Sequence, residues 1–267
     1  MELGLKTDTC SDNVSKELNY HGGKWATAHC SYFSDLVKAT PMLDAARSTA
    51  ERCRPEIIAD IGGGTGFLLR HLRDRMKGQR PRLVNVDISN DQLQVCSERG
   101  LDTLFCSALD LRREMLLGEG ERLMLISRSV LHYFGREGQD RFLSSLRSVM
   151  KKGEMMVHQP ACFASKEEKE CMNEIYPMMG VDKFYMTPYE LRAAHERNGW
   201  KVVEILNAPP LDLCSEDLAD RYALGEDDLK RLCITLRRYG LNRGTFEVDD
   251  RRFRGPFTYR IIIAKAN

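Results

Sequence analysis

The feature that most constrains this chain is a glycine-rich turn placed directly after a short apolar strand. Residues 56–61 are mostly apolar and lead into the run Gly62-Gly63-Gly64-Thr65-Gly66, and residues 67–75 then have helical spacing. Glycine lets the backbone approach a ligand closely, and the first turn of a helix points unpaired N–H groups at the same place. The segment therefore predicts a strand, a turn that holds a nucleotide-like cofactor, and a helix.

The spacing of the glycines separates two classes of cofactor. Dinucleotide-binding enzymes use the pattern G-x-G-x-x-G, in which the last glycine allows the helix to pack tightly on the strand. Gly62 and Gly64 fit the first two positions, but the third falls on Phe67. An NAD-dependent oxidoreductase is therefore disfavoured, and absence of nicotinamide binding would exclude it.

The pattern that remains is acidic-x-Gly-x-Gly-x-Gly, from Asp60 to Gly66. It resembles the first motif of the class I S-adenosylmethionine-dependent methyltransferases. The resemblance implies that the turn faces the methionine part of the cofactor, with Asp60, Gly62, Gly63 and Gly64 in contact with it. A carboxylate at the end of an apolar strand is costly without a partner, and the cofactor's amino group would provide one, directly or through the loop amides.

A second apolar strand follows at the interval that the resemblance requires. Residues 82–88 form it, and they include the carboxylate of Asp87 near their end. A carboxylate at this place would accept hydrogen bonds from the two hydroxyls of a ribose. Asp87 and the neighbouring Ile88 are therefore expected to bind the cofactor.

The adenine contact is expected in the next loop. Residues 101–110 read as a short third strand followed by the segment that touches the adenine ring in the resembled family. The resemblance implies that Ser107, Ala108 and Leu109 lie at this contact. Many relatives have an aspartate where this chain has Ser107, so the serine hydroxyl, a backbone group or Asp110 would take its place.

Apolar strands and helical segments alternate over roughly two hundred residues, which is typical of a doubly wound parallel sheet. The predicted fold class is α/β, with a Rossmann-like sheet of seven mostly parallel strands, and the resemblance implies that the last strand is antiparallel. Further strands are expected at 122–128, 153–160, 200–206 and 259–264, and helices at 139–151 and 187–199.

Two regions lie outside the pattern of the sheet and should govern the choice of substrate. Residues 1–54, with Tyr20, His21, Trp25, Tyr32 and Phe33, are expected to form an N-terminal helical cap before a methyltransferase domain at 55–267. A lid segment and an insertion emerge where ligands collect in open parallel sheets, beyond the carboxyl ends of the strands, and would roof the site. The lid is 159–186 and the insertion 207–256, with helices expected at 167–172, 215–223 and 226–239.

Length and charge limit the possible partners. A chain of 267 residues can bury one sizeable core, and its formal net charge of +1 gives no overall reason to expect a nucleic-acid partner. Near the C-terminus, basic and acidic residues alternate in a stretch that is either a solvated face or a pocket wall selecting an anionic substrate. The arginines of this stretch are Arg237, Arg238, Arg243, Arg251, Arg252 and Arg254.

The nine cysteines include no Cys-x-x-Cys pair, so neither structural zinc nor a disulfide framework is expected. Met1 to Cys10 contains no leader and no long apolar run, which predicts a cytoplasmic protein that does not enter a membrane. His158, Cys162 and Cys171 fall close together after the fifth strand. They are either buried apolar thiols beside a histidine or a thiophilic site, and no metal is predicted.

Some methyl acceptors need a base to remove a proton, and two histidines are candidates. Val130-Leu131-His132-Tyr133 is similar to a segment that follows the fourth strand in the resembled family, which makes His132 the first candidate. His158 is the second. The alternative for both is a histidine satisfied by a backbone carbonyl. Arg128 either lines the methionine end of the cofactor or starts the following helix.

The sequence therefore predicts an S-adenosylmethionine-dependent methyltransferase, with S-adenosylhomocysteine as product and a small, in one interpretation anionic, molecule as acceptor. Residues 127–130 lack the Asn/Asp-Pro-Pro-aromatic motif of enzymes that methylate the amino groups of DNA or glutamine. This absence counts against a nucleic-acid or protein amide acceptor. A macromolecular acceptor is kept as an alternative, and a non-catalytic cofactor-binding subunit is another. Whether oxygen, nitrogen or carbon is methylated, and whether the chain forms a homodimer, stays open.

Overall fold

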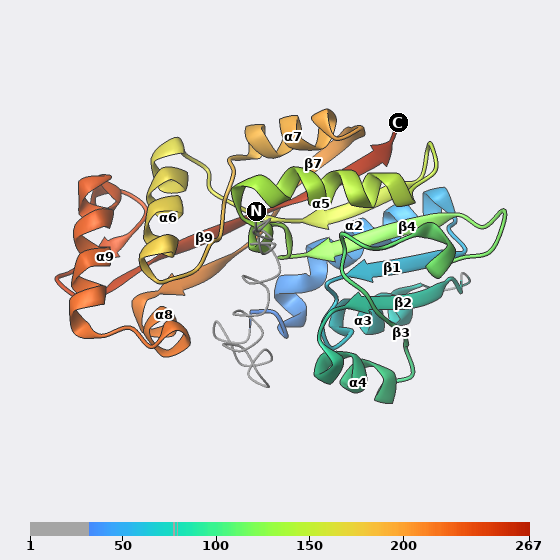
Figure 1. The fold of residues 1–267 in the computed structure, drawn as a ribbon, viewed down its shortest axis with the longest axis horizontal. Coiled ribbons are helices and arrows are strands. Elements are labelled where there is room, and N and C mark those ends of the chain that lie inside the picture. Colours follow the sequence, from blue (N-terminus) through green and yellow to red (C-terminus); the bar gives the residue numbers. More distant parts are fainter. Residues whose placement is uncertain (1–31, 77, 79) are drawn as a thin grey trace, which may run out of the picture.

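A computed structural model describes residues 32–267 with the exception of 77 and 79, so the expectations for Tyr20, His21 and Trp25 lie outside the described residues. Strands and helices alternate in the described chain as predicted (Figure 1). The strands are β1 (Ile57–Ile61), β2 (Arg82–Asp87), β3 (Asp102–Phe105), β4 (Leu123–Arg128), β5 (Met155–Gln159), β6 (Ala161–Cys162), β7 (Trp200–Cys214), β8 (Glu247–Val248) and β9 (Phe253–Ala266). The α-helices are α2 (Leu36–Cys53), α3 (Phe67–Arg75), α4 (Asn90–Glu98), α5 (Gly135–Val149), α6 (Lys166–Met178), α7 (Pro188–Arg197), α8 (Ser215–Tyr222) and α9 (Glu226–Arg238).

The strands form one mostly parallel sheet, in which β3, β2, β1, β4 and β5 lie side by side in that order. The last strand, β9, pairs antiparallel with β5 and with β7, which confirms the expected antiparallel ending. The short strands β6 and β8 also pair with β9 and extend the sheet beyond the seven strands predicted. Because β1, β2 and β4 run parallel and start in register, their carboxyl ends meet at one edge.

Helices cover both faces of the sheet, as the doubly wound pattern predicts. Strand β1 is buried along its whole length and sends alternate side chains to the two faces. Ile57, Ala59 and Ile61 join the core under α5 and α7, whereas Ile58 joins the core under α2 and α3. Helix α2 shares a core with Ile58 of β1 and so covers one face of the sheet.

The antiparallel pair of strands β7 and β9 is much longer than predicted. Both strands continue far beyond the predicted 200–206 and 259–264, so the insertion 207–256 begins and ends as strand and is helical only between them. Pro209 and Pro210 hide this continuation in the sequence, because proline donates no ladder hydrogen bond. They lie where the pairing register of β7 and β9 shifts, between Ala208 and Leu211.

The lid and the insertion pack together as one distal lobe, defined here as α6, α8, α9 and the outer part of the β7–β9 hairpin. Phe163 and Ile175 from the lid share a buried cluster with Leu218 and Leu236 from the insertion. Figure 1 shows the arrowheads of β1 and β4 pointing toward the side on which this lobe lies. No helix in the described part of the chain combines the length and the apolar character needed to cross a bilayer.

Candidate functional site

The glycine turn adopts a conformation that only glycines accommodate well. Gly62, Gly64 and Gly66 have positive φ angles of 68°, 57° and 74°. A Cβ atom at Gly63 would lie 2.1 Å from Asn85 Oδ1, and one at Gly64 would lie 2.4 Å from Gln92 Oε1. The turn is therefore held close to β2 and α4 on its inner side, and larger residues would displace it.

Asp60 lies beneath this turn with no hydrogen-bond partner for either carboxylate oxygen among the described residues. Its side chain is 1% exposed, and the position of a Cβ at Gly63 would be 2.7 Å from its Oδ2. Burial first, and then the charge of Asp87, raise the pKa of Asp60 to about 8 against the opposing effect of Arg128. A buried carboxyl without a partner at a glycine turn fits a cationic ligand group, such as the amino group of an amino acid.

Asp87, at the end of β2, accepts hydrogen bonds from three backbone amides, one of which belongs to the turn. Its Oδ2 accepts a hydrogen bond from Gly64 N at 2.8 Å, and its Oδ1 accepts from Ile88 N and Ser89 N at 2.8 and 2.9 Å. Burial raises the pKa of Asp87, and these three hydrogen bonds act in the opposite direction. A carboxylate has about four acceptor positions, so Oδ2 can still accept a bond from a ligand hydroxyl.

Asn85 also holds the turn, although it was not among the predicted site residues. It lies beside Asp60 in the ladder of β1 and β2. Its Nδ2 donates to the carbonyl oxygen of Gly64 at 2.6 Å. Asn85 and Asp87 therefore bond the carbonyl and the amide of the same residue of the turn. The signal available in the sequence was a buried amide in the middle of an otherwise apolar strand. A polar residue there must have a partner, and the partner is the turn.

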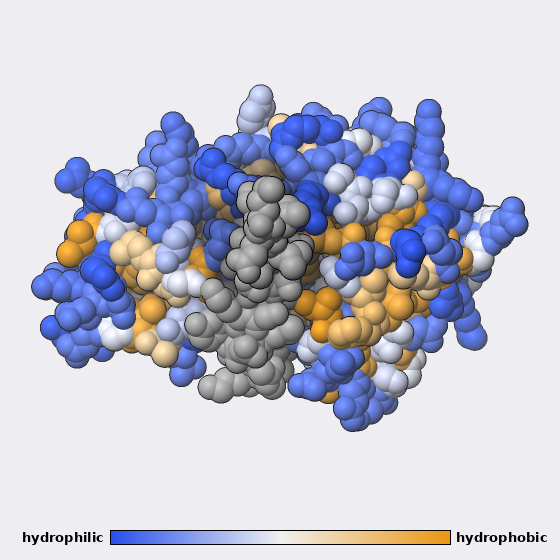
Figure 2. All heavy atoms as spheres, viewed as in Figure 1, coloured by the Kyte–Doolittle hydropathy of each residue, from blue (hydrophilic) through white to orange (hydrophobic). Residues whose placement is uncertain are grey.

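The loop after β3 brings Ser107, Ala108 and Leu109 to the same edge of the sheet. Cys106 N donates to the carbonyl oxygen of Asp87, which fixes the loop to the end of β2. The hydroxyl of Ser107 accepts a bond from Leu109 N at 3.2 Å and so shapes a local turn. Phe105, the last residue of β3, is 60% exposed next to this loop. Figure 2 shows apolar surface on the half of the molecule that contains β1 to β4.

Arg128 ends β4 and holds the segment that precedes α2. Its guanidinium donates to the backbone carbonyls of Tyr32 and Phe33 at 3.3 Å and lies 5.1 Å from the centre of the Tyr32 ring. A cation over an aromatic face is attracted by the ring quadrupole. Arg128 therefore joins the chain before α2 to the edge that carries Asp60, while its charge favours the ionised form of that carboxyl.

Comparison with known protein families finds a match over 58–153, about a third of the chain, to a family described as a methyltransferase domain. Residues 58–153 of the chain are a methyltransferase domain. The match spans β1 to the turn before β5 and so contains the turn, Asp87 and the Ser107 loop. The protein is a methyltransferase, as the sequence predicts.

Solved structures with the same fold include two that cover most of this methyltransferase. One is the YcgJ protein of Bacillus subtilis, which is 15% identical with a TM-score of 0.63 over 85% of this chain and 98% of that chain. Another is the 1,6-didemethyltoxoflavin N1-methyltransferase of Burkholderia thailandensis, crystallised with 1,6-didemethyltoxoflavin and S-adenosylhomocysteine. It is 13% identical with a TM-score of 0.56, and the match covers 100% of this chain and 93% of that chain. No curated protein matches the sequence.

The two candidate bases of the methyltransferase lie in different surroundings. His132 is in a short 3-10 helix after β4 (Leu131–Phe134), stacked on Tyr185 at 5.4 Å between ring centres and close to Tyr133. His158 is fully buried on the helix-covered side of β5, where its Nδ1 lies 3.3 Å from His195 Nε2. Burial and the charge of His195 hold the pKa of His158 well below its usual range. Its surroundings therefore argue against a base that meets substrate, because the ring packs beside Phe142 under α5.

A tyrosine cluster lies on the lobe side of His132 and was not recognised from the sequence. It contains a buried cation, because Lys183 is 4% exposed and donates to the Tyr222 hydroxyl at 2.7 Å. Its Nζ also lies 4.7 Å from the centre of the Tyr133 ring. A second cation, Arg221, donates to the Tyr133 hydroxyl. The cluster consists of Tyr32, Tyr133, Tyr176, Tyr185, Tyr222 and Tyr259.

The arginines near the C-terminus, in contrast, face solvent and pair with carboxylates. Arg237 pairs with Asp250, and Arg238 pairs with Glu174. Three further pairs involve Arg251 with Glu226, Arg252 with Glu216, and Arg254 with Asp212. Of the two alternatives for this stretch, the structure supports the solvated, charge-balanced face over a pocket wall.

Cys162 and Cys171 are buried thiols in separate elements, β6 and α6. Burial raises the pKa of Cys162 to about 11 and that of Cys171 to about 12. Among the described residues, no group of three His, Cys, Asp or Glu side chains has a geometry that could hold a metal ion. Both cysteines therefore belong to the apolar packing of the chain.

We expect these two thiols to resist alkylation in the folded protein. The thiolate is the reactive form, and at pH 8 a thiol with a pKa of about 11 or 12 is almost entirely protonated. Iodoacetamide labelling at pH 8, followed by peptide mass spectrometry, should modify Cys162 and Cys171 only after denaturation. Half-buried Cys53 provides an internal comparison, and modification of Cys171 at the rate of Cys53 would contradict the assignment.

Proposed function

We propose that this enzyme transfers the methyl group of S-adenosylmethionine to a small anionic molecule that lies against the tyrosine cluster. The observation that carries the proposal is the buried ammonium of Lys183, surrounded by tyrosine rings on the lobe side of the carboxyl edge. Lys183 and Arg221 both lie against Tyr133, and two cations at one place favour an anionic ligand group. The cluster and the cofactor turn meet at Tyr32, which lies over Arg128 and stacks on Tyr259.

The roles proposed for the cofactor-binding residues follow from their hydrogen-bonding capacity. Asp60 takes the amino group of the methionine part, because its carboxylate is buried and unpaired beneath the turn. Asp87 accepts a bond from a ribose hydroxyl while its bond from Gly64 N holds the turn and its bonds from Ile88 N and Ser89 N fix the carboxylate. Ile88 and the Ser107, Ala108 and Leu109 loop flank the adenine. The cofactor supplies an electrophilic sulfonium methyl, so the protein has to orient the acceptor and exclude water.

For the acceptor, Ser129, directly after β4, and Tyr259, in the middle of β9, supply adjacent hydroxyls that lie 3.1 Å apart. Gln159, at the end of β5, is fully buried beside Tyr32. A side-chain amide has two donor and two acceptor positions, so Gln159 can still bond a ligand. His132 is the proposed base where the acceptor has a proton to lose, since it is next to Tyr133 in this part of the site.

Methyl transfer from S-adenosylmethionine to a panel of small carboxylates and phenolates, with no other protein present, tests the proposal. We expect turnover with members of this panel, and Lys183→Met should raise their KM at least about tenfold because one charge-assisted contact is lost. The Kd for S-adenosylhomocysteine should not change. Lys201→Met, which removes an exposed lysine of β7, is the matched control.

Each outcome addresses a different alternative. Turnover of neutral acceptors with equal KM in Lys183→Met would refute the anionic acceptor but keep the small molecule. Methylation of RNA, DNA or protein in preference to every small molecule would favour the macromolecular alternative. Cofactor binding without any turnover, restored by a protein partner, would identify a non-catalytic subunit. A homodimer, which the sequence left open, would be detected by sedimentation in the same samples.

A further inference from the structure

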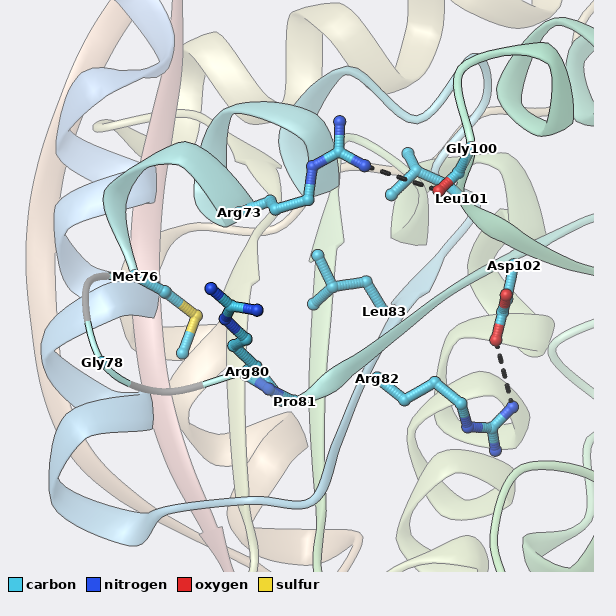
Figure 3. A pocket seen from close by; sticks show the side chains of 10 residues that line it. All are labelled: Arg73, Met76, Gly78, Arg80, Pro81, Arg82, Leu83, Gly100, Leu101 and Asp102. Carbon is cyan, nitrogen blue, oxygen red and sulfur yellow. Dashed lines mark hydrogen bonds and ion pairs between the residues drawn. The ribbon is translucent and has the colours of Figure 1, made fainter.

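A pocket of about 550 Å³ opens at the opposite edge of the sheet from the glycine turn (Figure 3). Arg82 and Asp102, which line it, are the first residues of β2 and β3, whereas the cofactor residues lie at or just beyond the carboxyl ends of β1 and β2. Because a strand rises about 3.3 Å per residue, the length of β2 places the pocket roughly 17 Å from Asp87. The pocket is therefore separate from the methyl-transfer site.

The floor of this pocket is apolar. Met76, Leu83 and Leu101 line it and are almost completely buried, and they belong to the end of α3, to β2 and to the start of β3. Three elements of the sheet and its helix layer thus support the floor. Such a floor accommodates a flat or apolar group, and the volume is within the range of small-molecule pockets.

The rim of the pocket is basic, with three exposed arginines and a single carboxylate, Asp102. Arg82 is engaged with that carboxylate and with the carbonyl oxygen of Leu116. Arg73 makes one long bond of 3.4 Å to the carbonyl oxygen of Gly100. Among the described residues, Arg80 has no hydrogen-bond or ion-pair partner. Figure 3 shows the guanidinium group of Arg73 above Leu83 and that of Arg80 to its left.

The surrounding sequence concentrates positive charge at this place. Residues 70–82 contain five arginines and a single acidic residue, Asp74, in a chain whose formal net charge is only +1. The arginine stretch near the C-terminus is neutralised by ion pairs, but Arg73 and Arg80 have no carboxylate partner among the described residues. Their charge is available for an anionic ligand, and a guanidinium both binds phosphate in a bidentate manner and stacks on flat rings.

We infer that this pocket binds a nucleotide, with the phosphate held by Arg73 and Arg80 and the base lying on Leu83 and its apolar neighbours. The nucleotide is either free or part of a single strand, because both present the same phosphate and ring. The inference does not depend on the proposed acceptor, since neither arginine contacts the residues of the methyl-transfer site.

Binding is tested by calorimetry with ATP in the presence of saturating S-adenosylhomocysteine, which keeps the cofactor site filled. Inorganic phosphate and adenosine are titrated separately, and a ten-nucleotide oligothymidine tests the single strand. We expect ATP to bind at least ~10-fold more tightly than phosphate or adenosine, with Arg73→Gln and Arg80→Gln each weakening it at least ~10-fold. Arg192→Gln removes an equal charge from α7, outside the pocket, and should leave binding unchanged.

Tight binding of the oligonucleotide with weak binding of ATP supports the inference and identifies the strand as the source of the nucleotide. Absence of binding by both ligands overturns it, as does equal loss of affinity in Arg192→Gln. Equal affinities for phosphate and ATP would show that the apolar floor takes no part, which also overturns the nucleotide. Unchanged S-adenosylhomocysteine binding in the Arg73 and Arg80 variants separates these results from any failure of the methyl-transfer site.

Discussion

Replacing Asp87 with alanine should weaken S-adenosylhomocysteine binding by about 100-fold, the largest single effect that we expect at the cofactor site. Two losses combine in this variant. The carboxylate no longer accepts a ribose hydroxyl, and the N–H groups of Gly64, Ile88 and Ser89 lose their common acceptor. Calorimetry on wild type and variant measures the change, and thermal unfolding shows whether the variant is folded.

Asp91→Ala is the matched control, because it removes an exposed carboxylate only four positions away, in the first turn of α4. It should bind the cofactor product as wild type does. Asp87→Asn keeps one side-chain oxygen as a hydrogen-bond acceptor. Its affinity for S-adenosylhomocysteine should therefore lie between those of the alanine variant and wild type. An affinity of Asp87→Ala within threefold of wild type would exclude Asp87 from the cofactor site. It would also mean that the motif of this chain is wrongly aligned with that of the family.

Cofactor binding should release a proton from Asp60 at pH 7. The pKa of about 8 in the free protein means that this carboxyl is largely protonated at neutral pH, and a bound ammonium group would favour its ionised form. Titrations with S-adenosylhomocysteine in two buffers of different ionisation enthalpy measure the number of protons released. We expect a value approaching one in wild type and a clearly smaller value in Asp60→Asn.

The same carboxyl makes the stability of the free protein depend on pH. The ordinary pKa of aspartate is 3.8, so between pH 4 and pH 8 the folded protein keeps a proton on Asp60 that the unfolded chain has lost. The folded state therefore binds more protons, and the contribution of Asp60 to the free energy of unfolding falls as pH rises, by up to about 1.4 kcal/mol per pH unit. It is fully present below pH 4.

Urea unfolding at several pH values tests this sign. The difference between wild type and Asp60→Asn should change steadily from pH 4 to pH 8, with the wild type losing stability relative to the variant as pH rises. Asp44→Asn, at an exposed position of α2, should leave the pH dependence unchanged. A wild type that gains stability over Asp60→Asn across this range would show that Asp60 is ionised and already has a partner.

Local patterns were sufficient for most of the regular structure. The helix at 187–199 was predicted from Thr187 as N-cap with Pro188 beside it, and the structure has a capping box there and a helix over Pro188–Arg197. Helix α3 has the predicted bounds. Hydrogen bonds between near neighbours determine such features, and the residues that form them are adjacent in the sequence.

Features that depend on distant partners were predicted less well. The extension of β7 to Cys214 was not recognised, because only β9, some forty residues later, provides the hydrogen bonds that keep Pro209 and Pro210 within a strand. His158 was placed near substrate because it ends a strand, but alternation along β5 directs its ring to the helix layer and to His195. Which face a strand residue occupies is decided by what covers that face.

The cofactor turn could be predicted from the sequence because its residues are contiguous. Asp60 to Gly66 carry both the carboxylate and the glycines with positive φ, so one short segment specifies the chemistry of cofactor binding. The acceptor side could not be found in this way. Lys183, Tyr133, Tyr222 and Tyr259 come from four separate parts of the chain, and only the packing of the lid and the insertion around one core brings them together.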